Sequence, residues 1–211
     1  MSEQAMLEAA AGVVSRETWE ALQLYVARLR EWNQRINLVS AGDMANVWQR
    51  HIADCAQLHP LARADTRWLD FGSGAGLPGL VIAILRREES GWMHMVESNG
   101  KKCAFLAAVI SELALRATVH HQRIEKISSQ NIRDIEVVSA RAVAALPRLL
   151  DLAEPWLAAG AHALFQKGRD FSAELDLCRD HWQFDLVQHR SRIDRDSVIL
   201  ELSRVRRTET S

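Results

Sequence analysis

The sequence lacks any apolar run approaching the about 18 residues needed to cross a membrane, and no basic leader precedes an apolar block at its start. Cysteine is also scarce. Cys55, Cys103 and Cys178 are odd in number and widely separated, which argues against a disulfide framework. These absences predict a cytoplasmic protein with free thiols and no membrane partner.

An excess of positive charge is missing as well. The formal net charge is −1, which argues against binding naked nucleic acid through a global positive field. A local basic patch stays possible, because several cations fall in expected loops or at element ends. They include Arg50, Lys101, Lys102, Arg141, Lys167 and Arg169. Solvated surface charge is the competing interpretation for each of them.

The 211 residues fit one α/β domain with a short extension and a single core. Residues 1–64 are expected to form a helical N-terminal extension that includes a helix over 44–58. Four apolar residues recur there at the spacing of one buried helix face: Trp19, Leu22, Val26 and Leu29. Residues 65–211 are expected to form one compact second unit.

From residue 66 onward, short apolar runs alternate with helical stretches. Strands are predicted over 68–71, 93–97, 117–122, 136–140 and 161–166, and helices over 78–87, 100–113 and 146–157. This alternation predicts right-handed crossovers and a doubly wound, mostly parallel sheet. The consecutive strand-like runs 182–190 and 198–205 predict an antiparallel C-terminal hairpin at its edge.

A glycine-rich loop follows the first predicted strand. Residues 70–79 read Asp-Phe-Gly-Ser-Gly-Ala-Gly-Leu-Pro-Gly, and such a loop allows positive φ and close approach of a ligand to the backbone. The dinucleotide fingerprint G-x-G-x-x-G fails, because its sixth position is Leu77. The spacing G-x-G-x-G favours S-adenosylmethionine over a nicotinamide cofactor.

Polar residues follow the other predicted strands, whose carboxyl ends meet at the ligand edge of an open α/β sheet. The Glu97 carboxylate is suited to the two hydroxyls of a ribose, although capping the next helix is the competing interpretation. Residues 123–125 are suited to framing a planar base. Arg141 and Lys167, at the ends of neighbouring strands, predict an anionic substrate.

Together these motifs closely resemble one family, the bacterial 16S ribosomal RNA guanine-N7 methyltransferases of the RsmG (GidB) type. The resemblance covers residues 19–170. It rests on residues 32–33, 37–40, 50–54, 70–79, 97–98, 100–102, 105–106, 123–125, 139–142 and 167–168. The Leu-Pro-Gly addition to the glycine loop, paired with Arg-His-x-x-Asp upstream, is its most specific part.

The resemblance implies a Rossmann-like class I methyltransferase fold with a seven-stranded sheet and a helical N-terminal extension. It implies methylation of N7 of one guanine in the decoding-region loop of 16S rRNA. The implied cofactor site for S-adenosylmethionine comprises Asp70, Gly72, Ser73, Gly74, Gly76, Leu77, Glu97, Ser98, Ile124, Glu125 and Arg141. The glycines would hold its methionine part, Glu97 its ribose, and residues 124–125 its adenine. The chain departs from the family at Phe71, Glu97 and Val143, and at the last position an aromatic residue is frequent.

The expected RNA contacts are Arg50, Lys101, Lys102, Arg123, Lys167 and Arg169. His51 and Asp54, three residues apart on one helical face, are expected to brace the cofactor loop. No cluster has metal-ligand spacing, so no metal is expected. The expected partner is 16S rRNA within the small ribosomal subunit or its precursor, bound by a monomer.

Guanine N7 has an unprotonated lone pair, so methyl transfer needs alignment of the reacting atoms rather than a general base. Arg141 is the candidate catalytic residue, binding a phosphate or guanine O6. A salt bridge from Arg141 to Glu97 or Asp70 is its competing interpretation. Two other functions stay open: a methyltransferase for a small molecule or protein, and a nucleotide-binding regulator without catalysis.

Overall fold

The computed structural model describes residues 1–208 and contains a seven-stranded sheet in the order β3-β2-β1-β4-β5-β7-β6. Strands β1 to β5 pair in parallel, whereas β7 is antiparallel to both β5 and β6. The strands are β1 (Trp68–Phe71), β2 (Met93–Glu97), β3 (Ala117–His121), β4 (Val137–Arg141), β5 (His162–Lys167), β6 (Trp182–Arg190) and β7 (Val198–Arg207). The predicted doubly wound sheet and its C-terminal hairpin are confirmed.

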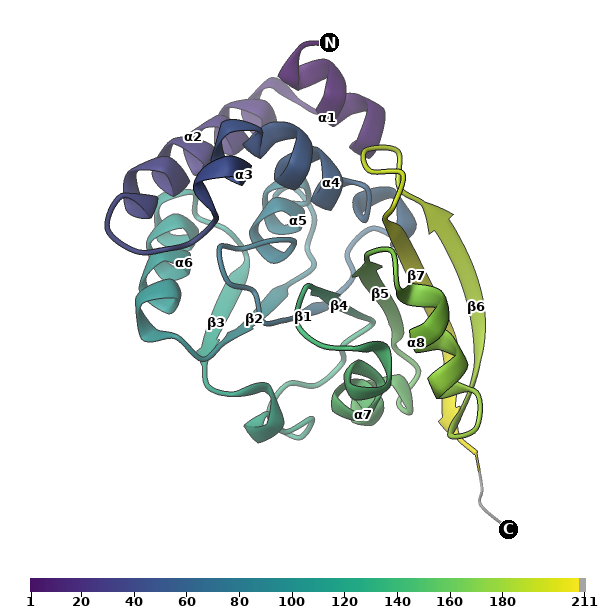
Figure 1. Cartoon of the computed structure of the whole chain (residues 1–211). Coiled ribbons are helices and arrows are strands. Elements are labelled where there is room, and N and C mark those ends of the chain that lie inside the picture. The colour runs from purple at the N-terminus through teal and green to yellow at the C-terminus, as the bar shows by residue number, and fades with distance from the viewer. Residues whose placement is uncertain (209–211) are drawn as a thin grey trace.

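Helices cover both faces of this sheet (Figure 1). One face carries α5 (Gly79–Leu85) and α6 (Gly100–Glu112), and the other carries α7 (Leu146–Leu157) and α8 (Phe171–Cys178). The sequence prediction missed α8, a short helix in the connection between β5 and β6. A short 3-10 helix, η3 (Ile124–Lys126), stands in the β3–β4 connection where no α-helix forms.

The N-terminal extension packs over α5 and α6. It comprises α1 (Glu3–Ala11), α2 (Arg16–Asn33), α3 (Ala41–Ala45), the π-helix η1 (Trp48–Ala53), α4 (Asp54–Ala56) and the 3-10 helix η2 (His59–Leu61). The single helix expected over 44–58 is therefore divided by a π-helical segment. Its predicted apolar face is nevertheless buried, including Val47, Cys55 and Leu58.

The physical reason for the extension is the composition of α5. This helix is apolar all round, and Gly79 through Ile84 are buried on every side. A helix of this kind needs cover on the face turned away from the sheet. Leu22, Val26 and Leu29 of α2 supply part of it, and one hydrophobic cluster joins the extension to the sheet.

A single buried hydrogen bond joins this extension to the glycine loop. The Tyr25 hydroxyl of α2 donates to the Ala75 carbonyl oxygen at 2.7 Å, and both residues are buried. Tyr25 also packs near Phe105 of α6, with ring centroids 6.3 Å apart. The loop is therefore held from the side of the extension.

We expect Tyr25→Phe to lower the free energy of unfolding by about 1–3 kcal/mol, because the buried Ala75 carbonyl loses its donor while the ring packing stays. Chemical denaturation followed by circular dichroism measures this. An exposed change on the same helix, Glu20→Gln, serves as the control and should have little effect. Equal stabilities for Tyr25→Phe and the original chain would contradict the tether.

Candidate functional site

The glycine loop after β1 has a conformation that other residues adopt with difficulty. Gly72, Gly74 and Gly76 have φ of +62°, +55° and +88°. A Cβ added at Gly76 would lie 2.5 Å from Leu80, and one at Gly72 would lie 2.7 Å from Val143. Val143 thus packs against the loop.

Asp70 of β1 packs against the end of this loop at Gly79. It is fully buried, and its Oδ1 accepts a hydrogen bond from the Ser139 hydroxyl at 2.7 Å. Burial raises the pKa of Asp70 to about 6. A Cβ added at Gly79 would lie 2.8 Å from Asp70 Oδ2, so only glycine fits there. The Asp70 side chain positions the loop from inside the protein.

Glu97, at the end of β2, holds the loop from the side. Its Oε2 accepts from the Gly74 N–H at 2.9 Å, and its Oε1 accepts from the Asn99 N–H at 2.7 Å. A carboxylate has about four acceptor sites, so two remain for hydroxyl donors. Asn99 in turn caps α6 through the Lys101 and Lys102 amides.

The other expected cofactor residues border the same strand ends. The Ser98 carbonyl lies 3.2 Å from His121 Nε2. Ile124 and Glu125 form η3, where the exposed Glu125 carboxylate pairs with Arg148 at 3.0 Å. Leu77 packs beside the main core cluster. The cofactor candidates therefore surround one end of β1, β2 and β3.

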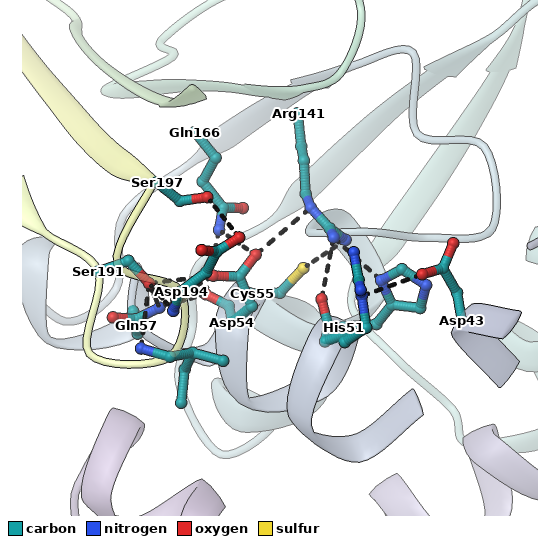
Figure 2. A network of polar contacts seen from close by, with 12 residues as sticks. Asp43, His51, Asp54, Cys55, Gln57, Arg141, Gln166, Ser191, Asp194 and Ser197 are labelled. Carbon is teal, nitrogen blue, oxygen red and sulfur yellow. Dashed lines mark hydrogen bonds and ion pairs between the residues drawn. The ribbon is translucent and has the colours of Figure 1, made fainter. Parts of the chain in front are cut away.

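Arg141 turns toward the N-terminal extension (Figure 2). Its Nη2 donates to the Arg50 carbonyl at 3.0 Å and lies 2.9 Å from His51 Nδ1, while its Nη1 lies 3.6 Å from Cys55 Sγ. Its ion-pair partner is Asp54, at 3.5 Å. The structure thus corrects the alternative that named Glu97 or Asp70 as that partner.

His51 and Asp54 contact Arg141. They were expected to brace the glycine loop, but the hydrogen bond from the extension to that loop comes from Tyr25. Burial and, secondarily, the Arg141 charge lower the pKa of His51 to about 4. Burial raises the pKa of Asp54, against the opposing effect of Arg141. The Tyr25 contact escaped prediction, although a phenol on an apolar helix face was a usable signal, since buried hydroxyls need partners.

A cleft of about 790 Å³ opens beside Arg141. Its walls are η1 and α4 of the extension, the ends of β4 and β5, and the β6–β7 loop. This volume falls within the roughly 300–1,000 Å³ of ligand sites. The polar residues lining it include Arg50, Asp54, Arg141, Gln166, Lys167, Arg169, Asp194 and Arg195.

The expected RNA-contacting cations are divided into two groups. Arg50, Lys167 and Arg169 line the cleft, whereas Lys101, Lys102 and Arg123 follow β2 and β3 on the other side of the glycine loop. Lys167 is 10% exposed; its Nζ pairs with Glu174 at 2.6 Å and donates to the Ala144 carbonyl. That lysine therefore fixes the cleft wall, while Arg50 and Arg169 make exposed pairs with Asp43 and Asp196.

Within residues 1–208, no three His, Cys, Asp or Glu side chains converge as a metal site would require. None of the helices in that range is long and apolar enough to cross a membrane.

The chain matches the family described as rRNA small subunit methyltransferase G over residues 18–195. Ribosomal RNA small subunit methyltransferase G of Brucella canis is 52% identical over 195 residues, which cover 92% of this chain and 91% of that protein. The protein of the same name from Brucella ovis is 51% identical over the same shares.

Solved structures with low sequence identity share the fold. A cofactor-bound protein from MTB, Rv0187, aligns with a TM-score of 0.59 and 15% identity over 95% of each chain. A SAM-dependent O-methyltransferase from Thermotoga maritima aligns with a TM-score of 0.55 and 15% identity over 88% of this chain and 73% of that one. The predicted Rossmann-like class I methyltransferase fold is confirmed.

Gly76→Ala is expected to lower the free energy of unfolding by about 3 kcal/mol, since it combines positive-φ strain with a collision against Leu80. Gly74→Ala is the matched control in the same loop, because its Cβ would meet nothing closer than 3.7 Å. It should cost about 1 kcal/mol from backbone strain alone. Equal losses in urea denaturation would contradict the packing account.

His51 should make stability sensitive to acid. Its folded pKa of about 4 lies below the ordinary 6.5, so the unfolded chain binds more protons and stability is lost as pH falls from 6.5 toward 4. Relative to His51→Gln, the original chain should lose about 1–2 kcal/mol more between pH 7 and pH 5. Parallel denaturation curves at both pH values would show this, and a difference unchanged by pH would exclude it.

Proposed function

The chain belongs to the rRNA small subunit methyltransferase G family, and from this we propose that it methylates N7 of one guanine in the decoding-region loop of 16S rRNA with S-adenosylmethionine. One observation carries the proposal beyond sequence similarity. The G-x-G-x-G loop follows β1, and the neighbouring strand β4 ends in Arg141, which lines a cleft together with other arginines and with carboxylates. The proposed site for S-adenosylmethionine would thus lie next to the proposed site for RNA.

The residues present fit the cofactor. Gly72, Gly74 and Gly76 add no side chain of their own to the loop, where φ is positive at all three, and Glu97 keeps acceptor sites for two ribose hydroxyls. We assign the methionine part to this loop, the ribose to Glu97, and the adenine to Ile124 and Glu125. When bound, S-adenosylmethionine supplies an electrophilic methyl group on its sulfonium sulfur.

Guanine N7 needs no deprotonation before attack. Its lone pair forms the new bond to carbon as the bond between carbon and sulfur breaks, and the methylated base carries positive charge. The protein then has to align the two atoms about 3 Å apart and exclude water.

Arg141 is proposed as the catalytic residue that contacts the substrate. A guanidinium has five N–H donors. Among the described residues, Arg50, His51, Cys55 and Asp54 account for four contacts, the last two of them long. One Nη1 hydrogen therefore remains for a phosphate or for guanine O6.

Arg50 and Arg169 are proposed to bind phosphates at the rim of the cleft. Exposed ion pairs contribute only about 0–1 kcal/mol, so a phosphate can replace Asp43 or Asp196 at little cost. A net charge of −1 gives little long-range attraction to RNA. We therefore propose an assembled or nearly assembled small subunit as the substrate, met by a monomer in the cytoplasm.

The direct test incubates the protein with methyl-labelled S-adenosylmethionine and small ribosomal subunits that lack the modification, followed by mapping of the labelled base. We expect one 7-methylguanosine in 16S rRNA and much slower labelling of protein-free rRNA. Label in a protein or a small molecule would overturn the RNA assignment. Equal labelling of free rRNA and subunits would overturn the preference for the assembled particle.

Arg141→Lys and Arg141→Ala are expected to lower methylation about 100-fold or more, because lysine keeps the charge without the planar fork. Affinity for S-adenosylhomocysteine should stay within a few-fold, as titration calorimetry would measure. Arg179→Ala, which removes an exposed arginine that directly follows α8 and pairs with Asp176, is the matched control. Full activity in Arg141→Ala would exclude the proposed role.

A further inference from the structure

Arg141 and Asp54 form an adjacent donor and acceptor on one wall of the cleft. Arg141 Nε lies 3.5 Å from Asp54 Oδ2, and the two side chains are 20% and 13% exposed. Both residues line the cleft, and they come from elements 87 positions apart in sequence, the end of β4 and the start of α4. Such a pair presents a cationic N–H donor next to a carboxylate.

The order of the strands shows which of Arg141 and Asp54 lies nearer to the glycine loop. β1, with the glycine loop, neighbours β4 on one side, and β5 neighbours β4 on the other. Asp54 is bonded to Gln166 of β5, whose Nε2 donates to Asp54 Oδ2 at 3.2 Å. From the cofactor loop outward, the wall therefore runs from Arg141 to Asp54 and Gln166.

Guanine carries its functional groups in a matching order. N7 and O6 are acceptors, N1–H is a donor, and N2 bears two donor hydrogens, so O6 stands between N7 and N1. We propose that Arg141 donates to O6 while the Asp54 carboxylate accepts from N1–H and N2–H of the target guanine. This pairing, which rests on the proposed function, turns N7 toward the glycine loop.

Asp54 has the capacity for this role. Its short contacts are with Gln57 Nε2 at 3.1 Å and Gln166 Nε2 at 3.2 Å, whereas the Ser191 hydroxyl is 3.5 Å away. Arg141 Nε and the Ser191 hydroxyl make the two longer contacts, each at 3.5 Å, so these are the acceptor sites that a base would take over.

The same wall rejects adenine. Adenine would place its N6 amine against the Arg141 donors and its N1 acceptor against the Asp54 carboxylate, so both contacts would be repulsive. Inosine is the sharper probe, because it keeps N7, O6 and N1–H and lacks only the N2 amine. Loss of one hydrogen bond to a buried charged group should lower the rate about tenfold or more.

The experiment uses small subunits reconstituted with 16S rRNA that carries guanosine or inosine at the mapped target position, and compares kcat/KM for the two. The original chain should prefer guanosine about tenfold or more. Asp54→Asn, whose amide offers one acceptor oxygen, should prefer it by less than about threefold. Asp176→Asn removes an exposed carboxylate of α8 outside the cleft and should keep the original ratio.

Each outcome bears on a different claim. Equal kcat/KM for guanosine and inosine in the original chain overturns this proposal and leaves N7 methylation intact, and it needs no folded variant. A ratio preserved in Asp54→Asn while both rates fall assigns Asp54 a structural role and also overturns the proposal. An absence of 7-methylguanosine on guanosine subunits overturns the proposed function and this proposal with it.

Discussion

The arrangement of the site depends on the burial of one guanidinium between two parts of the chain. Arg141 ends β4, yet its hydrogen bonds go to the Arg50 carbonyl and His51 of the extension, and its ion pair goes to Asp54. A largely buried charge needs both a counter-ion and hydrogen-bond partners. The extension supplies both, so its position over the sheet is fixed by electrostatics as well as by the apolar cover of α5.

The glycine loop is fixed from three directions by groups outside it. Asp70 lies close to Gly79 inside the protein, Glu97 accepts a hydrogen bond from the Gly74 amide, and Tyr25 of the extension donates one to the Ala75 carbonyl. A loop held this way loses little conformational freedom when it binds a ligand. Preorganisation of this kind suits a reaction that depends on alignment rather than proton transfer.

The elements near the glycine loop followed from local sequence signals, whereas the cleft did not. Strands β1 and β2, helix α7 and the hairpin had clear apolar periodicity or spacing. The pairing of Arg141 with Asp54 joins residues with no common local pattern, and no periodicity marks a π-helical segment within a helix. Lys167 illustrates the limit: a cation at a strand end suggested a substrate contact, but its partner Glu174 lies on the unpredicted helix α8.

The cleft can form during synthesis only after the segments that make its walls are present. Residues 46–54 leave the ribosome early, but the opposite wall requires β5 and the 191–199 segment. β7 must then insert between β5 and β6, which leaves the hairpin as the last piece of the sheet. A nascent chain that ends near residue 160 already has its glycine loop and the Asp54 partner of Arg141. It lacks β5 and the 191–199 segment, so the groove beside them can form only after both of these later segments have been added to the chain.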